Sequence, residues 1–503
     1  MIQQCQSTEI TEQEFPELYQ FYHHFPEKYP YLLATTSQSS SETDVKNESQ
    51  TFYDVLFIEP EDYLKLDYHL KLSTSIELKL SSDSTFLDAF DQWYRSEQGA
   101  VSQSQQNGCC EISLPFMGGW FIFLAYELAQ QIEPCLELPL DEMLLPVAYA
   151  ARVKMALIFD HTREKLFFIS EPGIDHHRAY QSLVLDSQAI LQSRQSNIKP
   201  EELLLALDEE DDEIFLKSVS TVKDYIKEGD VFQVNLSRLW QAQINATDFQ
   251  FDSQINAHSR LAATLYQLLS IANPAPFSGV ASFASEQGVA SVISSSPERL
   301  LKIHNQQLES RPIAGTRPRS GSEKEDIRLM QELHKHPKEQ AEHIMLIDLI
   351  RNDLGRVCEP GTVVVDELMS NESYAHVHHI VSNVIGQMQA SKTPSDAIKA
   401  LFPGGTITGC PKVRCMEIIS ELEQHSRGAY TGSMGYINLD GSMDLNILIR
   451  TMVLGLTAQE NSNDYSQMLS FRAGAGLVFD SVAVKELQET RAKAKGLLKA
   501  LQG

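Results

Sequence analysis

The sequence predicts an α+β protein in which antiparallel β-sheets are flanked by helices. Strand-length segments rich in β-branched and aromatic residues occur in both halves of the 503-residue chain. Helices lie between some of them, but the second half opens with a strand, a helix and two further strands, without repeated strand–helix units. A doubly wound parallel sheet requires such units, so antiparallel sheets are favoured.

The first half contains the clearest predicted strands. Residues 53–60 have the apolar density of a buried strand, and residues 68–80 alternate like two antiparallel strands. Residues 147–160 and 165–172 predict a hairpin, because a short polar turn separates two apolar segments. The other predicted elements of this half are helices at 86–94 and 179–193 and a buried strand or helix within 117–129.

An acidic break at residues 195–212 is the best candidate linker. It divides the chain into an N-terminal region, 1–205, and a second region, 206–503, which we expect to pack closely on the first. Helices are predicted to end at Gly229 and to run from Pro337 to Gly355. The remaining predicted elements are strands at 231–240, 273–283 and 289–303 and a helix at 482–501.

Charge and composition exclude several classes of function. The net charge of −27 and the pI near 4.9 disfavour binding to nucleic acid or to an anionic membrane surface, since both need a basic face. No apolar run reaches the roughly 18 residues that span a bilayer. Seven cysteines without paired C-x-x-C spacing, and no secretory signal, indicate a cytoplasmic protein with reduced thiols.

The segment 402–417, FPGGTITGCPKVRCME, predicts a glycine-rich loop that leads into a helix. Gly404, Gly405 and Gly409 permit close backbone approaches, and Pro411 suits the first position of a helix. Exposed amides and the positive end of the helix dipole would favour a phosphate or a carboxylate. A tight turn that caps a core helix is the alternative.

Three carboxylates on two predicted helices are candidate metal ligands. Glu342 extends an apolar stripe towards the interior, and Glu486 and Glu489 share one helix face with Lys493 one turn further along. Together the three carboxylates suit Mg²⁺, which prefers oxygen ligands. The alternatives are a buried ion pair for Glu342 and a solvated Glu489–Lys493 pair on the last helix.

His379 is the best candidate for a general acid or base, since the unperturbed pKa of imidazole lies near neutrality. His376 and His378 compete with it. Alternation along a strand would place these two on one face and His379 on the other, which disfavours a metal site made of all three. Cys410 could be a nucleophile at a helix start, but a small residue fitted to a turn is the simpler interpretation.

Seven motifs in order resemble the chorismate-utilising enzymes, which include anthranilate synthase component I, aminodeoxychorismate synthase component I, and the isochorismate and salicylate synthases. The resemblance is dense over residues 214–500 and looser before them. The motifs are PIAGTRPRS, EHIMLIDLIRNDLGRV, HHIVS, FPGGTITGCPKVRCMEII, GYINLDGSMDLNILIRT, AGAGLVFDS and ETRAKAKGLL. The resemblance implies a sandwich of two antiparallel sheets with flanking helices.

The resemblance also implies roles for individual residues. Glu342, Glu486 and Glu489 would hold Mg²⁺ against the ring carboxylate of chorismate. His379 would lie beside the C4 hydroxyl group, and Thr316 and Thr406 would line the pocket. The residues expected to grip the enolpyruvyl carboxylate or to form the surrounding backbone are Tyr430, Arg450, Gly474, Ala475, Gly476 and Gly405.

Within this family the resemblance favours an enzyme that uses ammonia. Gln233 stands where isochorismate and salicylate synthases carry a lysine that activates water. The loop FPGG-TITGCPK resembles aminodeoxychorismate synthases, whereas Ala314 in PIAGT is the anthranilate form of a motif in which many aminodeoxychorismate synthases have a lysine. We weigh the longer loop motif more heavily and expect 4-amino-4-deoxychorismate, on the route to p-aminobenzoate and folate.

Two alternatives stay open: anthranilate synthase component I, and a non-catalytic paralogue that binds tryptophan. The chain lacks the G-x-C-x-G-x-Q nucleophile turn of a glutamine amidotransferase, so a separate amidotransferase subunit would supply the ammonia. The N-terminal region of this family often holds tryptophan, and PYLLATTS, residues 30–37, lies where such a pocket would start.

Overall fold

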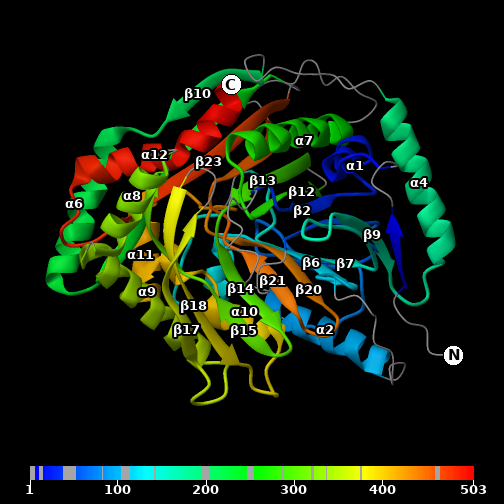
Figure 1. The fold of residues 1–503 in the computed structure, drawn as a ribbon, viewed down its shortest axis with the longest axis horizontal. Coiled ribbons are helices and arrows are strands. Elements are labelled where there is room, and N and C mark those ends of the chain that lie inside the picture. The colour runs from blue at the N-terminus through cyan, green and yellow to red at the C-terminus, as the bar shows by residue number, and fades with distance from the viewer. Residues whose placement is uncertain are drawn as a thin grey trace.

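The computed structural model describes residues 6–10, 15–37, 52–81, 83–102, 114–140, 143–193, 203–245, 254–285, 288–318, 322–335, 337–373, 377–458 and 465–503. They form two large antiparallel sheets, of 12 and 11 strands, with helices on the outer faces (Figure 1). The predicted α+β class is therefore confirmed. Within the described residues no helix is both long and apolar enough to cross a membrane.

The 12-stranded sheet combines strands from the whole length of the chain. Its path runs β1 (Gln6–Ile10), β9 (Lys165–Ser170), β8 (Met155–Asp160), β3 (Tyr53–Ile58), β2 (Tyr31–Ala34), β12 (Phe277–Ser285), β13 (Gly288–Ser296), β22 (Thr451–Ala458), β23 (Tyr465–Leu477), β11 (Gln233–Ile244) and β10 (Leu204–Glu209). The short β19 (Gly409–Cys410) pairs with β11 beside this path.

The 11-stranded sheet is built in the same interleaved way. Its path runs β16 (Ile313–Pro318), β18 (Val377–Gln387), β15 (Gln307–Ser310), β14 (Arg299–His304), β21 (Met443–Asn446), β20 (Ser433–Asn438), β6 (Gly119–Leu124), β7 (Ala148–Val153), β4 (Tyr63–Leu66) and β5 (Leu72–Thr74). β17 (Val364–Ser373) pairs with β18 at the side.

The two sheets pack face to face over an apolar core, as the family resemblance implied. Phe57 of β3 and Phe121 of β6 meet edge to face with ring centroids 5.6 Å apart, and Tyr31 stacks on Phe121 at 4.0 Å. These side chains belong to one buried cluster that also contains Val292 and Met434. Aromatic burial of this kind contributes most of the stabilisation between the layers.

Helices cover the outer face of each sheet. On the 12-stranded sheet these are α1 (Leu18–His24), α4 (His176–Gln192), α7 (Gln254–Ala272) and α12 (Ala483–Gln502), with α6 (Asp212–Glu228) and α11 (Lys412–Glu423) over β11 and β23. On the other sheet they are α2 (Phe86–Ser102), α9 (Pro337–Gly355) and α10 (Pro394–Leu401). The other described helices are α3 (Ala129–Ile132), α8 (Glu323–Lys335) and the 3₁₀ turns η3 (Tyr126–Leu128) and η4 (Gly405–Ile407).

Several predicted elements differ from the structure. The predicted strand 147–160 breaks at Lys154, where the chain leaves the 11-stranded sheet after β7 and enters the other sheet as β8. The pair of strands predicted at 68–80 is wrong, because this stretch contains only the three-residue β5. The candidate linker 195–212 contains the strand β10, and residues 194–202 lie outside the described part.

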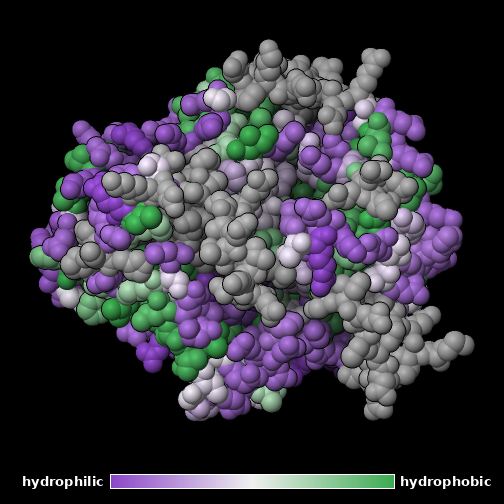
Figure 2. Space-filling model, in the orientation of Figure 1, coloured by the Kyte–Doolittle hydropathy of each residue, from purple (hydrophilic) through white to green (hydrophobic). Residues whose placement is uncertain are grey.

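Hydrophilic side chains predominate on the face drawn in Figure 2, in keeping with the strongly acidic composition. A hydrophobic area lies over α9 and β17, where Ile344, Val364 and Leu368 are exposed. Exposed apolar side chains elsewhere on this face are scattered, as on most protein surfaces.

Candidate functional site

Several of the predicted site residues lie near one end of the 12-stranded sheet, where β23 runs beside the start of β11. Gly476 pairs with Asn235 across this end. The segment 402–411 closes one side, because its strand β19 pairs with β11. α9 forms a second wall, where Glu342 accepts a hydrogen bond of 2.8 Å from Gln233 Nε2. α12 packs along β23 and forms the third.

Glu298, just before β14, is a buried carboxyl group in this site. It is 6% exposed, and Thr406 Oγ1 donates a 2.8 Å hydrogen bond to its Oε1. Burial raises the pKa of Glu298 to about 7, against the Thr406 hydrogen bond and the positive charges of Lys493 and Arg450. A carboxyl group with this pKa can hold or release a proton at neutral pH, as general acid–base catalysis requires.

Lys493 of α12 connects the substrate side of the site with its carboxylates. Its Nζ donates to the carbonyl oxygen of Gly474 at 3.0 Å and pairs with Glu489 at 2.9 Å. The side chain of Lys493 is 46% exposed. Desolvation lowers its pKa, but Glu489, Tyr430 and Glu342 raise the pKa more, so the group stays an ammonium ion. The half-exposed Glu489–Lys493 pair is the arrangement that the sequence analysis gave as the alternative to a metal site on this helix. Its cation also interacts electrostatically with Glu342 and with Glu298.

Arg450 reaches the same site from the turn before β22. Its backbone φ is +52°, a conformation uncommon for residues other than glycine. Its Nη1 donates to Asn273 Oδ1 at 3.4 Å, and burial lowers its pKa although the charge of Glu298 opposes this. Arg450 remains a cation because the ordinary pKa of a guanidinium is above 12. Such backbone conformations are often found at functional sites.

Glycine is required at Gly474 and Gly476 because other side chains approach them closely. A Cβ on Gly474 would lie 2.6 Å from both the Tyr430 hydroxyl oxygen and Asn235 Oδ1. A Cβ on Gly476 would lie 2.6 Å from Gln233 Nε2. Ala475 points to the other face of the strand, where it is fully buried. The two glycines therefore bare the backbone of β23 towards the site, and Ala475 anchors the strand in the core.

The glycine loop takes part in the site through a side chain. Gly405 lies against α9, since a Cβ there would meet Leu349 Cδ2 at 2.2 Å. Gly409 has φ +129° and would place a Cβ 2.1 Å from the Gln233 carbonyl oxygen. These contacts fix the loop between α9 and β11. As a result Thr406 is held at Glu298.

The proposed Mg²⁺ ligands suit the ion in chemistry and lie on α9 and α12, the two helices beside the end of β23. Glu486, in the first turn of α12, is 6% exposed, and Glu489 lies one turn further along the same helix. Glu342 lies 3.4 Å from the position of a Cβ on Gly476, beside the β23 end on which α12 packs. All three offer carboxylate oxygens, as Mg²⁺ prefers. Among the described residues no three such side chains are already gathered into a metal-binding group.

The structure places the predicted catalytic residues Thr316 and His379 only by their backbone. They are directly opposite each other in the β16–β18 ladder, so the two segments PIAGT and HHIVS lie side by side. Their side chains, and that of Ala314, lie outside the described part of the chain, as does all of His376. Their roles in catalysis stay predictions.

Sequence analysis missed Glu298 and read Lys493 only as half of a surface pair. The signal for Glu298 was a lone carboxylate in SSSPERLL, directly after the buried strand β13. An acidic residue next to a buried strand needs a partner, and here the partner is a hydroxyl group from a segment more than a hundred residues away. No local pattern reveals such a partner.

Cys410 and His343 have no catalytic features. Burial, together with Asp353, raises the pKa of the Cys410 thiol, so the thiolate needed for nucleophilic attack is disfavoured. His343, next to Glu342, is fully buried against the Ser382 hydroxyl at 2.6 Å, and burial lowers its pKa to about 4. His343 is therefore a neutral structural histidine.

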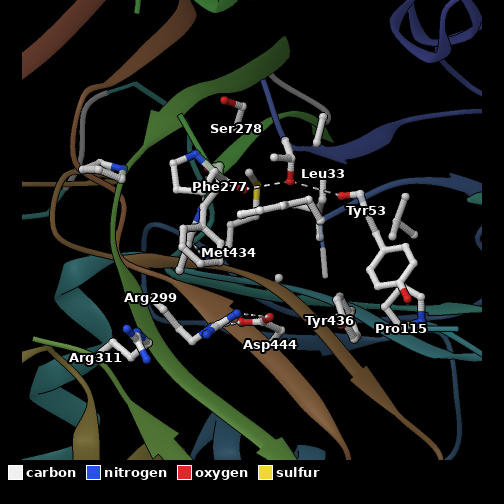
Figure 3. A pocket seen from close by; sticks show the side chains of 18 of the residues that line it. Leu33, Tyr53, Pro115, Phe277, Ser278, Arg299, Arg311, Met434, Tyr436 and Asp444 are labelled. Atoms are coloured by element: carbon white, nitrogen blue, oxygen red, sulfur yellow. Dashed lines mark hydrogen bonds and ion pairs between the residues drawn. The ribbon is translucent and has the colours of Figure 1, made fainter. Parts of the chain in front are cut away.

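A separate cavity of about 110 Å³ lies between the two sheets (Figure 3). Leu33 and Tyr53 line it from the 12-stranded sheet, and Tyr436 and Asp444 line it from the other. Arg299 makes a bidentate pair with Asp444, at 2.9 and 3.1 Å. The cavity begins at the segment PYLLATTS, where sequence analysis placed the start of a tryptophan pocket.

The chain is similar in sequence and in fold to known chorismate-utilising enzymes. The chain is 43% identical over 390 residues to the anthranilate synthase component I-like protein of Synechocystis sp., covering 78% of this chain and 74% of that protein. It is 36% identical over 423 residues to the aminodeoxychorismate synthase component 1 of Bacillus subtilis, covering 83% and 82%. The crystal structure of anthranilate synthase component I from Streptococcus pneumoniae superposes with a TM-score of 0.69 at 28% identity, covering 92% and 95%. Because the family profile of chorismate binding enzymes also matches residues 45–499, the chain belongs to this family.

Proposed function

We propose that this protein aminates chorismate with ammonia to give 4-amino-4-deoxychorismate. The observation that carries the proposal is the meeting of Arg450, Lys493 and the bared β23 backbone around Glu298. Chorismate is a small cyclic diacid. Two fixed cations and exposed amides are the groups that bind carboxylates most strongly.

Arg450 and Tyr430 would bind the enolpyruvyl carboxylate, with the backbone of residues 474–476 beneath it. Lys493 is held by Glu489 and the Gly474 carbonyl, so its ammonium group is already oriented before substrate arrives. An oriented cation loses little entropy on binding, which favours a productive pose of the ring. Divalent cation chemistry would come from Mg²⁺ on Glu342, Glu486 and Glu489, which would neutralise the ring carboxylate.

Glu298 would supply the proton that the departing C4 hydroxyl needs when ammonia adds at C2. Its Oε1 accepts from Thr406, so Oε2 is the atom that would carry the transferable proton. A second ammonia addition at C4, with loss of the C2 substituent, would complete the exchange. His379 stays a second candidate for proton transfer at C4.

The choice of product rests on the loop 402–412 and on Gln233. Gln233 is hydrogen-bonded to Glu342 and has no basic group, so it offers no activation of water as nucleophile. The 36% identity to an aminodeoxychorismate synthase supports the proposal. The 43% identity to an anthranilate synthase component I-like protein, together with Ala314, supports anthranilate synthase component I as the second candidate.

One assay separates the two products. Purified protein would be incubated with chorismate, Mg²⁺ and an ammonium salt, and the products identified by mass. We expect 4-amino-4-deoxychorismate, which keeps its enolpyruvyl group. Fluorescent anthranilate formed without an added lyase would overturn the proposal. An Ala314→Lys variant tests whether a lysine at this position raises the rate, as attack on C2 through the side chain predicts.

We further propose that a glutamine amidotransferase subunit delivers the ammonia.

We also propose that the cavity of Figure 3 holds an amino acid of the tryptophan type. The bidentate Arg299–Asp444 pair offers both charges to an α-amino and an α-carboxylate group, and Phe277 offers an aromatic wall. L-Tryptophan should raise the melting temperature of the protein, because a ligand bound only by the native state stabilises it. Asp444→Asn should abolish that shift.

A further inference from the structure

Another cavity, of about 260 Å³, lies on the same face of β23 as the chorismate site. Side chains alternate along a strand, so Met468, Ser470 and Arg472 point to the same side as Gly474. The walls are completed by β22 and by the loop after α11. We name this cavity the Arg472 pocket; its lining includes Leu140, Met143, His425, Arg427, Val453 and Tyr430.

The charged groups in the described lining of the Arg472 pocket are the guanidinium groups of Arg472 and Arg427. Arg472, Arg427 and His425 line it, and no carboxylate is among its described lining residues, although the whole chain carries a net charge of −27. The nearby carboxylates lie behind the wall. Glu423 pairs with both Arg427 and Arg472, at 2.7 and 3.0 Å, and Glu127 accepts the backbone amides of Arg427 and Gly428.

The guanidinium group of Arg472 has one hydrogen-bond donor atom without an acceptor among the described residues. Its side chain is 3% exposed; Nε donates to Ser237 Oγ and Nη2 to Glu423, both at 3.0 Å, while Nη1 has no hydrogen-bond partner among the described residues. A buried guanidinium N–H without an acceptor costs free energy. Since the lining offers it no carboxylate, an occupant of the pocket would have to supply the acceptor.

The pocket also has an apolar lining. Leu140, Met143, Val453 and Met468 contribute to it. The chemistry of this lining matches a small molecule with an acidic head and an apolar body.

We propose that the Arg472 pocket binds a small organic carboxylate, with the carboxylate accepting from Nη1 of Arg472 and the apolar body against Met143 and Met468. The N–H groups of Arg427 all donate within the protein, so Arg427 contributes only its charge. The pocket is distinct from the chorismate site, whose cations are Arg450 and Lys493. Tyr430 lines the pocket and its hydroxyl group reaches Gly474, so it forms the wall between the two sites.

The test is a ¹⁹F NMR titration of the whole protein with 4-fluorobenzoate, with neutral 4-fluorobenzamide as the matched probe. We expect the wild-type protein to bind the acid and not the amide. Arg472→Gln should weaken the affinity at least tenfold. Ser470→Trp, which fills the cavity and leaves the Arg472–Glu423 pair in place, should do the same.

Two further variants show whether 4-fluorobenzoate binds in the Arg472 pocket or elsewhere on the protein. Arg351→Gln, an exposed arginine of α9 paired with Asp348, is the control for loss of one guanidinium and should bind as the wild type does. Arg450→Gln should also leave this binding unchanged. Binding that is absent in the wild type, unaffected by both pocket variants, equal for acid and amide, or lost only in Arg450→Gln would overturn the proposal. No turnover is measured, so the result is independent of which product the enzyme makes.

Discussion

At the residue scale, the site balances a buried acid against two cations. Glu298 is buried enough to raise its pKa, yet Lys493 and Arg450 are near enough to oppose that rise. A bound diacid would compete for the same two cations and leave Glu298 with less opposing charge. Substrate binding should therefore favour the protonated form of Glu298, which is the form that can act as an acid.

Glu298→Gln should lower kcat by roughly 10² to 10⁴, the usual contribution of a general acid. In the wild type, kcat should fall as the pH rises through about 7, because the carboxyl group then loses its proton. The variant should lose this limb of the profile. Rates would be measured at a constant concentration of free ammonia, so that the titration of ammonium is not read as that of the enzyme. An unchanged profile would remove Glu298 from proton transfer.

The same substitution should stabilise the fold above neutral pH. The pKa of Glu298 is about 7 in the native state against an ordinary value of 4.5, so between these values the native state binds one proton more than the unfolded state. The free energy of unfolding therefore decreases as the pH rises from 4.5 to 7, by roughly 3 kcal/mol in all. Glu298→Gln should melt at a higher temperature than the wild type at pH 8 and close to it at pH 5. Equal melting temperatures at pH 8 would contradict the buried, charged state of Glu298.

At the scale of elements, alternate residues of β23 face opposite sides of the strand, so that some face the site and others pack in the core. Gly474 and Gly476 leave room for Tyr430, Asn235 and Gln233, while the residue between them packs in the core. The strand therefore has to keep its register with β11, because a shift by one residue would point alanine at the site and glycine at the core.

Gly476→Ala should weaken the binding of Mg²⁺. The new Cβ would lie 2.6 Å from Gln233 Nε2 and 3.4 Å from Glu342 Oε1, so the Gln233–Glu342 hydrogen bond has to move. Loss of such support typically lowers metal affinity 10- to 100-fold. The concentration of Mg²⁺ giving half-maximal activity should rise by about that factor. Gly355→Ala, whose Cβ would meet no atom within 4 Å, is the control and should show no change.

The sequence predicted those elements whose ends are marked by particular residues, such as proline at the start of a helix and glycine at its end. α9 begins at Pro337 and ends at Gly355 as expected, and Gly229 ends α6 with φ +86°. Lys154 does not mark the break between β7 and β8 in this way. An apolar segment can form a strand in either sheet, and only packing determines where the chain passes from one sheet to the other. Motif resemblance placed Arg450, Tyr430 and Glu342 in one site, whereas Glu298 emerged only when distant segments were brought together.

At the scale of the whole molecule, the two regions of the chain share both sheets. β2 pairs with β12, and β6 pairs with β20, so residues before 205 are hydrogen-bonded neighbours of strands after 206. The core between the sheets also draws on both regions. The N-terminal region thus forms part of the scaffold that carries the site.

A polypeptide of residues 206–503 should fail to fold by itself. It would expose the edges of β12 and β20, and unpaired edges of long strands promote aggregation. Most of this polypeptide should be insoluble, and co-expression with residues 1–205 should recover soluble protein. Solubility and the cooperativity of thermal unfolding are the measurements. A soluble 206–503 polypeptide with a sharp unfolding transition would show that the second region is self-sufficient.

The position of Lys493 late in the sequence determines when the site is completed during protein synthesis. Its ammonium group completes the cradle, but it is carried by α12, whereas Glu298, Glu342 and Arg450 all precede it along the chain. During translation the ribosome makes nearly every other part of the site first. We therefore expect the polypeptide to bind chorismate and to become active only after α12 has emerged and docked on β23.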